Sequence, residues 1–339
     1  MNDTVTHSLL THAWFCLIGL MLVLYVITDG FDLGVGILSL LRPRGREADR
    51  NVMIESIGQV WDANETWLVV LAGALFGAFP AAYALLLSSL YGTIMLLIAS
   101  LIMRGAAVEF RQAAAPGYKL LWDRTFGLGS LLAAVAQGIV LGRLLTGLQL
   151  GGVNLGVAGA LNLGFILITV IGVVSGYTLL GATWLVRKTI GPLQRRARMY
   201  AIFALFGTVA CAFVVTLGTW VITPLGSAHW TDPGVLHVLL FLGAIAAAVS
   251  CYIVYATVKG RDHGPFNGAR LLFLVSFIGL AVSLFPDLVP GHFTVTQAAS
   301  ESSTLVFMLL GIGLSLPVMI TYNVYQYRSF KGKVASAEH

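Results

Sequence analysis

The sequence predicts an all-α integral membrane protein with about nine transmembrane helices. Of its 339 residues, 58% are hydrophobic and only 10% are charged, whereas soluble domains average about 45–50% and about 25%. Its uncharged stretches are long enough to cross a bilayer, which takes about 20 residues. Its basic residues gather in alternate connections between those stretches. This composition excludes an ordinary soluble domain, and it excludes a disordered chain, which needs low hydrophobicity and high charge.

The helices follow from the uncharged stretches in order. Residues 8–28 contain no charged residue, and the apolar character resumes through Leu41. The stretch 66–103 would be about 57 Å long as one helix, too long for one span. Gly77-Ala78-Phe79-Pro80 lies inside it, and proline interrupts helices.

The stretch 144–186 is also too long and is divided by Gly151-Gly152-Val153-Asn154. All predicted helices form one polytopic membrane domain over residues 1–339. Their expected ranges are 8–41, 51–77, 80–111, 119–148, 158–188, 196–223, 234–258, 268–286 and 302–328.

The distribution of positive charge predicts the orientation. Of the 20 Lys and Arg residues, 19 fall on one side of this map, and only Arg143 lies near the other. Connections rich in Lys and Arg stay in the cytoplasm. We therefore expect a periplasmic N-terminus and a cytoplasmic C-terminus, and we attribute the net charge of +5 to these loops and not to a nucleic-acid partner. The basic residues of the cytoplasmic side are Arg42, Arg44, Arg46, Arg50, Arg104, Arg111, Lys119, Arg124, Arg187, Lys188, Arg195, Arg196, Arg198, Lys259, Arg261, Arg270, Arg328, Lys331 and Lys333.

Carboxylates within the first two helices are the candidate functional residues, because ionisable groups at bilayer depth are costly. Asp29 and Asp32 share one face of the first helix, and Asp62 and Glu65 lie at a similar depth on the second. Glu55 precedes Asp62 by seven residues and would share its face. Such a ladder is typical of a proton path, but buried polar pairs that fix helix packing would give the same pattern.

Other residues near this ladder complete the expected site. Arg104 on the third helix is a candidate counter-ion, Asn64 is a candidate polar partner, and Trp61 and Trp67 flank the acids. The seven histidines lie mostly at helix ends or in loops, so we expect no haem ligands and no metal site on this chain. The three cysteines show no metal-binding or disulfide spacing.

Several motifs resemble one known family. They are Thr28-Asp29-Gly30-Phe31-Asp32-Leu33-Gly34-Val35-Gly36, Val60-Trp61-Asp62-Ala63-Asn64-Glu65-Thr66-Trp67-Leu68, Phe76-Gly77-Ala78-Phe79-Pro80, Arg104-Gly105 with Glu109-Phe110-Arg111, Gly181-Ala182-Thr183-Trp184-Leu185, and Tyr325-Gln326-Tyr327. Together they resemble subunit II of cytochrome bd-type quinol oxidases, including the cyanide-insensitive branch, over nearly the whole chain. The chain departs from that pattern at Ala63, where the family usually has Gly, and at Gln59, where it often has Pro.

The resemblance implies two four-helix bundles plus a peripheral helix. It implies a heterodimeric terminal oxidase of the inner membrane, with haems b and d in the partner, subunit I. It further implies that Asp29, Asp32 and Asp62, followed by Glu65 and Arg104, deliver cytoplasmic protons to the haem site. Quinol would be the substrate, quinone is held as a structural lipid in some members, and small single-helix subunits are further partners that the resemblance allows.

Two other functions fit the same acids. A proton-coupled secondary transporter would show inverted internal repeats, which the sequence does not display, and it would work without a partner chain. A purely structural subunit would use the acids for packing, and Asp62→Asn would then lower assembly more than turnover.

Overall fold

The computed structural model describes residues 2–42, 47–148, 157–223, 229–330 and 332–334. The predicted break at 151–154 and the basic residues Arg44, Arg46 and Lys331 lie outside these ranges. The helices are α1 (Asn2–Leu40), α2 (Glu47–Glu55), α3 (Trp61–Ala78), α4 (Pro80–Ser89), α5 (Tyr91–Ala113), α6 (Lys119–Thr146), α7 (Val157–Lys188), α8 (Gly191–Ile222), α10 (Pro233–Val258), α11 (Gly264–Leu284), α12 (Val295–Ala298) and α13 (Ser302–Ser329). A 3-10 turn covers Pro116–Tyr118, and two short strands, β1 (Asp287–Val289) and β2 (Phe293–Thr294), pair antiparallel.

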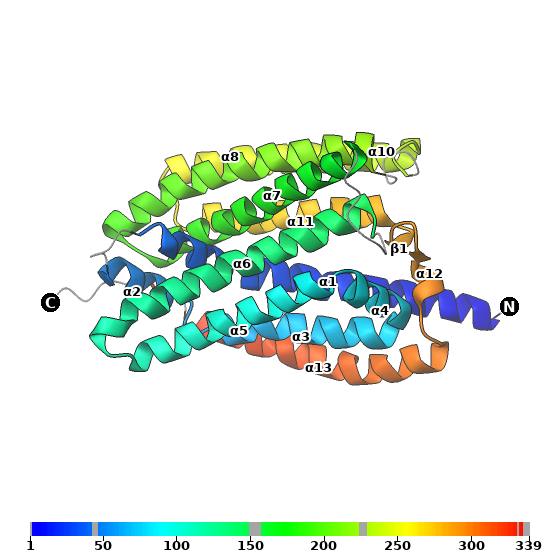
Figure 1. Ribbon diagram of the computed structural model, residues 1–339, viewed down its shortest axis with the longest axis horizontal. Helices are drawn as coiled ribbons and strands as arrows, with labels where there is room; N and C mark the ends of the chain where they lie inside the picture. The colour runs from blue at the N-terminus through cyan, green and yellow to red at the C-terminus, as the bar shows by residue number, and fades with distance from the viewer. Residues whose placement is uncertain (1, 43–46, 149–156, 224–228, 331, 335–339) are drawn as a thin grey trace.

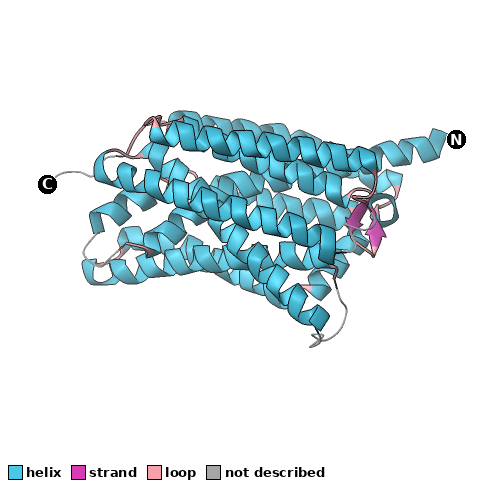
Figure 2. Cartoon of the chain, turned by 90° about the horizontal axis from the view of Figure 1, so that it is seen from above, coloured by secondary structure: helices cyan, strands magenta, loops and turns pink. Residues whose placement is uncertain are grey.

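The long helices run side by side along the long axis of the molecule (Figure 1). The start of α1, α12 and β1 lie at one end, and α2 lies at the other (Figure 1). Figure 2 shows the two strands at the same end as the start of the chain. Eight of the described helices are long and apolar enough to cross a membrane. The pair α3 and α4, bent by 120°, passes the same test together and brings the number to nine. The predicted class, an all-α membrane protein, is confirmed.

The helix expected over 51–77 is interrupted in the structure. It divides into α2 and α3, which are joined by turns at residues 56–60. The Ser56 hydroxyl donates to the carbonyl of Met53, and the Ser56 carbonyl accepts from the Trp184 indole instead of a helical N–H. Gly58, a poor helix former, lies in the same turn. These competing bonds replace the helical ladder at this position.

The helix expected over 80–111 is also divided. Pro80 occupies the first position of α4, where its missing N–H costs nothing, and Phe79 before it takes a non-helical backbone (φ −135°, ψ 62°). A second irregular residue, Leu90 (φ −115°, ψ 17°), separates α4 from α5. The other predicted ranges and the observed helices differ by five residues or fewer at most ends, apart from the start of α1.

The packing forms two groups of helices around the central helix α1. One group contains α1, α3, α5 and α6, the other contains α7, α8, α10 and α11, and α13 lies outside against α3 and α1. This arrangement agrees with the two bundles and peripheral helix that the resemblance implied. At the crossing of the two groups, a Cβ on Gly34 would lie 1.8 Å from the Tyr177 carbonyl oxygen. The absence of a side chain at Gly34 therefore lets α1 and α7 approach closely.

Candidate functional site

Arg104 on α5 joins two acids from different helices. Its Nη1 donates to Asp29 Oδ1 on α1 at 2.6 Å, and its Nη2 donates to Glu65 Oε2 on α3 at 3.4 Å. Arg104 and Asp29 are 1% and 0% exposed, whereas the Glu65 side chain is 23% exposed. Close approach of α6 fixes this part of α5, because Gly129 has no side chain to meet the Arg104 backbone. The structure thus places the expected counter-ion between an interior acid and a partly exposed one.

Asp32 lies one turn away on α1 and has a different kind of partner. Its Oδ2 accepts from Asn64 Nδ2 at 2.7 Å, and Asn64 Oδ1 in turn accepts from the Tyr327 hydroxyl on α13 at 2.8 Å. Asp32 and Asn64 are both 0% exposed. Eight residues of helix, each rising about 1.5 Å, separate Asp32 from Leu40 at the end of α1, so the acid lies about 12 Å from that helix end.

The buried acids share an electrostatic property. Asp29 Oδ2 and Asp32 Oδ1 are buried and have no hydrogen-bond partner among the described residues. Two carboxylates and one guanidinium, enclosed together, leave one negative charge uncompensated. An uncompensated charge in a low-dielectric interior is costly, and a bound proton removes it. The cluster is therefore chemically suited to hold and release a proton.

The other acids of the predicted ladder lie apart from this cluster. Asp62 is exposed on the first turn of α3, and Glu55 is exposed at the end of α2. The expectation that Glu55 and Asp62 share one helix face is wrong, because the turns at 56–60 separate their helices. The cluster therefore contains Asp29, Asp32 and Glu65, and the four carboxylates do not form one internal ladder.

The two tryptophans have different surroundings. Trp61 is partly exposed and packs against α5, where a Cβ on Gly105 would approach its ring to 3.1 Å. Trp67 is 2% exposed and belongs to the apolar core that continues along α3 to Ala78. Trp61 therefore lies near Arg104 and the acids, while Trp67 is a packing residue about 1.7 turns further along α3.

Four polar residues near the acids were not singled out from the sequence. Gln137 on α6 donates to the Tyr25 hydroxyl at 3.1 Å and accepts from the Tyr177 hydroxyl. Gln137 interrupts an apolar run, which is the signal that marks it in the sequence. Tyr327 belongs to a motif that the resemblance included, but nothing in the sequence indicates its contact with α3.

A second buried ion cluster lies nearer the basic end. Asp123 on α6 accepts from Arg50 Nε at 2.8 Å and from Arg111 Nε at 2.5 Å, and it is 2% exposed. Arg111 also donates to Asn51 Oδ1 at 2.6 Å. These bonds join α2, α5 and α6, so this cluster fixes the elements that carry Arg104 and the start of α3.

Comparisons with known proteins identify the family. The family described as cytochrome bd terminal oxidase subunit II matches residues 10–330. The chain is 30% identical to "Cytochrome bd ubiquinol oxidase subunit 2" of Bacillus subtilis, over 96% of this chain and 97% of that protein. It is 24% identical to "Cytochrome bd-I ubiquinol oxidase subunit 2" of Escherichia coli K12, over 98% and 97%.

A solved structure supports the same fold. A chain of the bd oxidase from Geobacillus thermodenitrificans superposes with a TM-score of 0.76 at 17% identity, covering 95% of this chain and 98% of that one. The motifs of α1 and α3, the helical architecture and the match over almost the full length agree. The chain therefore belongs to the family of cytochrome bd terminal oxidase subunit II.

Proposed function

We propose that this chain is subunit II of a terminal quinol:oxygen oxidoreductase in aerobic respiration. In this role it scaffolds the haem-bearing subunit I and supplies a proton path from the cytoplasm to the oxygen-reducing site. The reaction oxidises two quinols to quinones and reduces O2 to two waters, so protons must reach the oxygen site. Family membership and the names of the relatives support the oxidase assignment.

One observation carries the proton path: Asp29 and Asp32 are fully buried, and each has one bonded oxygen and one oxygen with no partner in the described part of the chain. Arg104 holds Asp29 Oδ1, so a proton that arrives at Asp29 binds Oδ2. Glu65 is partly exposed and bonds to the same guanidinium. We assign to it the step between the exterior of this chain and the buried pair.

The exposed acid Asp62 indicates where subunit I binds. A charged side chain in a spanning helix is costly where it faces lipid, so such residues usually face protein or water. We therefore place subunit I against the face of α3 that carries Asp62. We assign to Asp62 the entry of protons from water at that contact toward Glu65, one turn further along α3.

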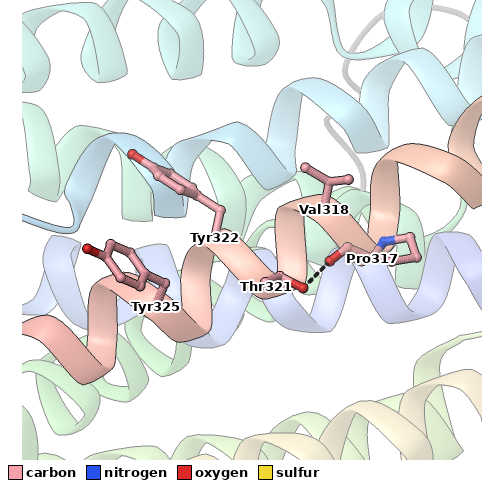
Figure 3. Close-up of a pocket in the computed structure, with 5 residues that line it drawn as sticks. All are labelled: Pro317, Val318, Thr321, Tyr322 and Tyr325. Atoms are coloured by element: carbon pink, nitrogen blue, oxygen red, sulfur yellow. Dashed lines mark hydrogen bonds between the residues drawn. The ribbon is translucent and has the colours of Figure 1, made fainter.

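The outer surface of α13, the helix that packs against α3 and α1, is a further candidate contact surface. It bears a shallow groove of about 480 Å³ lined by Pro317, Val318, Thr321, Tyr322 and Tyr325 (Figure 3). Thr321 is satisfied by the Pro317 carbonyl within the helix, so the groove is chiefly apolar. By the helical period, Val318 lies on the side of α13 opposite Tyr327. The groove is thus suited to a partner helix or a lipid chain, whereas Tyr327 on the opposite side of α13 bonds to Asn64 in the interior.

We assign the haems to subunit I, as the resemblance implies, and three histidines of this chain bond to its own backbone. His12, His229 and His292 each contact a backbone carbonyl oxygen, at 2.6, 3.0 and 3.2 Å. Within the described ranges, no three His, Cys, Asp or Glu side chains are grouped as for a metal ion. We propose that quinol binds to the assembled complex as its substrate, with quinone as a further bound lipid and small single-helix subunits as further partners.

We place the protein in the bacterial inner membrane with its N-terminus in the periplasm. The described basic residues at the end with α2 support this orientation. Arg196 bonds Asp49 at 3.2 Å, Lys333 bonds Asp262 at 2.5 Å, and Arg198 bonds the carbonyls that end α10. Connections of α1, α7, α10 and α13 thus meet at one basic end, as positive-inside orientation requires.

The test uses the complete oxidase purified with its partner. Asp32→Asn and Asp62→Asn are compared with Asp287→Asn for haem content and quinol-driven oxygen uptake. Asp287 is the first residue of β1, at the end of the molecule opposite α2. We expect normal haem spectra in all three variants and slow uptake in the first two. Intact uptake in Asp32→Asn would refute the proton path. Loss of haem together with uptake would favour the structural role of the acids, and absence of haem from the wild-type preparation would refute the oxidase assignment.

A further inference from the structure

Two hydrogen bonds in series connect the peripheral helix to a buried acid. The Tyr327 hydroxyl donates to Asn64 Oδ1, and Asn64 Nδ2 donates to Asp32 Oδ2, at 2.8 and 2.7 Å. Every donor in this series points toward Asp32. The series therefore ends on Oδ2 of the carboxylate, and Oδ1 has no hydrogen-bond partner in the described residues.

Aromatic packing holds the start of this series. The Tyr327 ring meets Phe31 at 6.3 Å and Trp184 at 6.2 Å, both edge-on, and Phe31 stacks on Trp184 at 4.2 Å. Phe31 directly precedes Asp32 in the chain. The hydroxyl and the acid are therefore fixed to the same aromatic cluster, and the hydrogen bonds are preorganised.

We propose that Tyr327 and Asn64 are positioning residues for Asp32: they keep Oδ2 as a permanent acceptor and so assign the transferred proton to Oδ1. This inference rests on the proposed proton path. A proton on Oδ2 would weaken the 2.7 Å bond from Asn64 Nδ2, because a hydroxyl oxygen is a poorer acceptor than a carboxylate oxygen. A proton on Oδ1 leaves both bonds of the series intact.

The same geometry excludes the series as a route for protons. The Asn64 amide nitrogen is a donor without a free lone pair, so it cannot receive a proton from the tyrosine side. Protons must reach Asp32 from its other side. The charged groups there are Asp29 on α1, Glu65 on α3 and Arg104 on α5.

Three groups outside this set face the neighbours of Asp32 and belong in any pH analysis. Tyr25 on α1 faces Asp29. Arg270 on α11 faces Tyr327, and Tyr177 on α7 faces Asp29. None of the three makes a direct hydrogen bond to Asp32 among the contacts of the described residues. The series from α13 is thus a fixed support that ends at Asp32.

The test measures the protonation of Asp32 directly, in the complete purified oxidase. Redox-induced infrared difference spectra record the C=O band of the protonated carboxylic acid against pH, and its loss in Asp32→Asn assigns the band. Asn64→Leu removes the donor to Oδ2, so the carboxylate form loses a bond. The pH midpoint of the band should then rise by about one to two units.

Tyr327→Phe keeps the ring and the Asn64 bond, so its midpoint should move less and in the same direction. Tyr255→Phe on α10 removes an equivalent hydroxyl from an exposed ring and serves as the control. Because Tyr327 acts through Asn64, the double variant should match Asn64→Leu alone. The pH profile of oxygen uptake should shift with the band.

Three results would overturn the assignment or its premise. If Tyr327→Phe and Asn64→Leu leave the midpoint where Tyr255→Phe leaves it, the residues do not position Asp32. If Tyr327→Phe lowers uptake tenfold or more with the midpoint unchanged, the tyrosine conducts. If Asp32→Asn itself leaves uptake unchanged, the proton path fails, and the positioning assignment is then judged by the band alone. Should Asn64→Leu fail to assemble, Tyr327→Phe still decides.

Discussion

Replacing Asp123 by Asn should strongly destabilise the protein. The carboxylate is 2% exposed and is the acceptor for Arg50 and Arg111, at 2.8 and 2.5 Å. The amide keeps the shape but removes the charge, and it turns an accepting oxygen into a donor that faces a guanidinium. Breaking a buried ion pair from one side costs about 3–5 kcal/mol, because the remaining charge stays buried without its partner.

Asp262 offers a matched control for this change. It also bonds two cations, Arg198 at 2.8 Å and Lys333 at 2.5 Å, but its side chain is 32% exposed. Solvent screens such pairs, which typically contribute about 0.2–1 kcal/mol each. Asp262→Asn should therefore lower the free energy of unfolding several-fold less than Asp123→Asn, although both substitutions are chemically identical.

The assay is unfolding of the purified complex by denaturant in detergent at low and high salt. Where unfolding is irreversible, the apparent Tm of both variants at one heating rate replaces the free energy. High salt should reduce the effect of Asp262→Asn and leave that of Asp123→Asn nearly unchanged, because buried pairs are screened less. Equal destabilisation by the two variants, or a loss below about 1 kcal/mol for Asp123→Asn, would refute the argument from burial.

Three further predictions concern other contacts. Partial burial raises the pKa of Asp262, but hydrogen bonding and the charges of Lys333 and Arg198 hold that pKa below its usual range. A carboxylate whose pKa is lower in the folded protein adds stability above its unfolded pKa and loses that stability as pH falls, so residues 332–334 should detach progressively below about pH 4. Equal hydrogen-exchange protection of the 259–263 turn at pH 3 and pH 6 would contradict this. Gly34→Ala should prevent accumulation of the complex in the membrane, since its Cβ would lie 1.8 Å from a carbonyl oxygen of α7. In the control Gly243→Ala on α10, the new Cβ meets nothing within 4 Å, so this variant should accumulate normally. Immunoblots of membranes compare the two variants. Arg104→Lys should slow oxygen uptake tenfold or more with haem retained, because one ammonium cannot reproduce the forked contacts to Asp29 and Glu65; uptake within twofold of wild type would show that any cation suffices.

The candidate site was predictable where it depends on composition. Asp29 and Asp32 stand out because acids in an apolar run are rare, and Arg104 stands out for the same reason. The helix break at 56–60 was not predictable, because it depends on an indole from α7 that takes the Ser56 carbonyl. The exposed position of Asp62 follows from that break. Because α3 does not continue α2 as one helix, the face on which Asp62 lies is no longer set by the residues of α2.

Tertiary structure alone decided which side chains meet. Tyr327 reaches Asn64 across 263 residues of sequence, and Arg50 and Arg111 converge on Asp123 from two other helices. The sequence by itself determined the membrane class, the approximate spans and the basic end, because transfer into a bilayer is a sum of local contributions from each residue. Pairing across helices depends on their relative rotation and depth, and these are set by close packing such as that at Gly34.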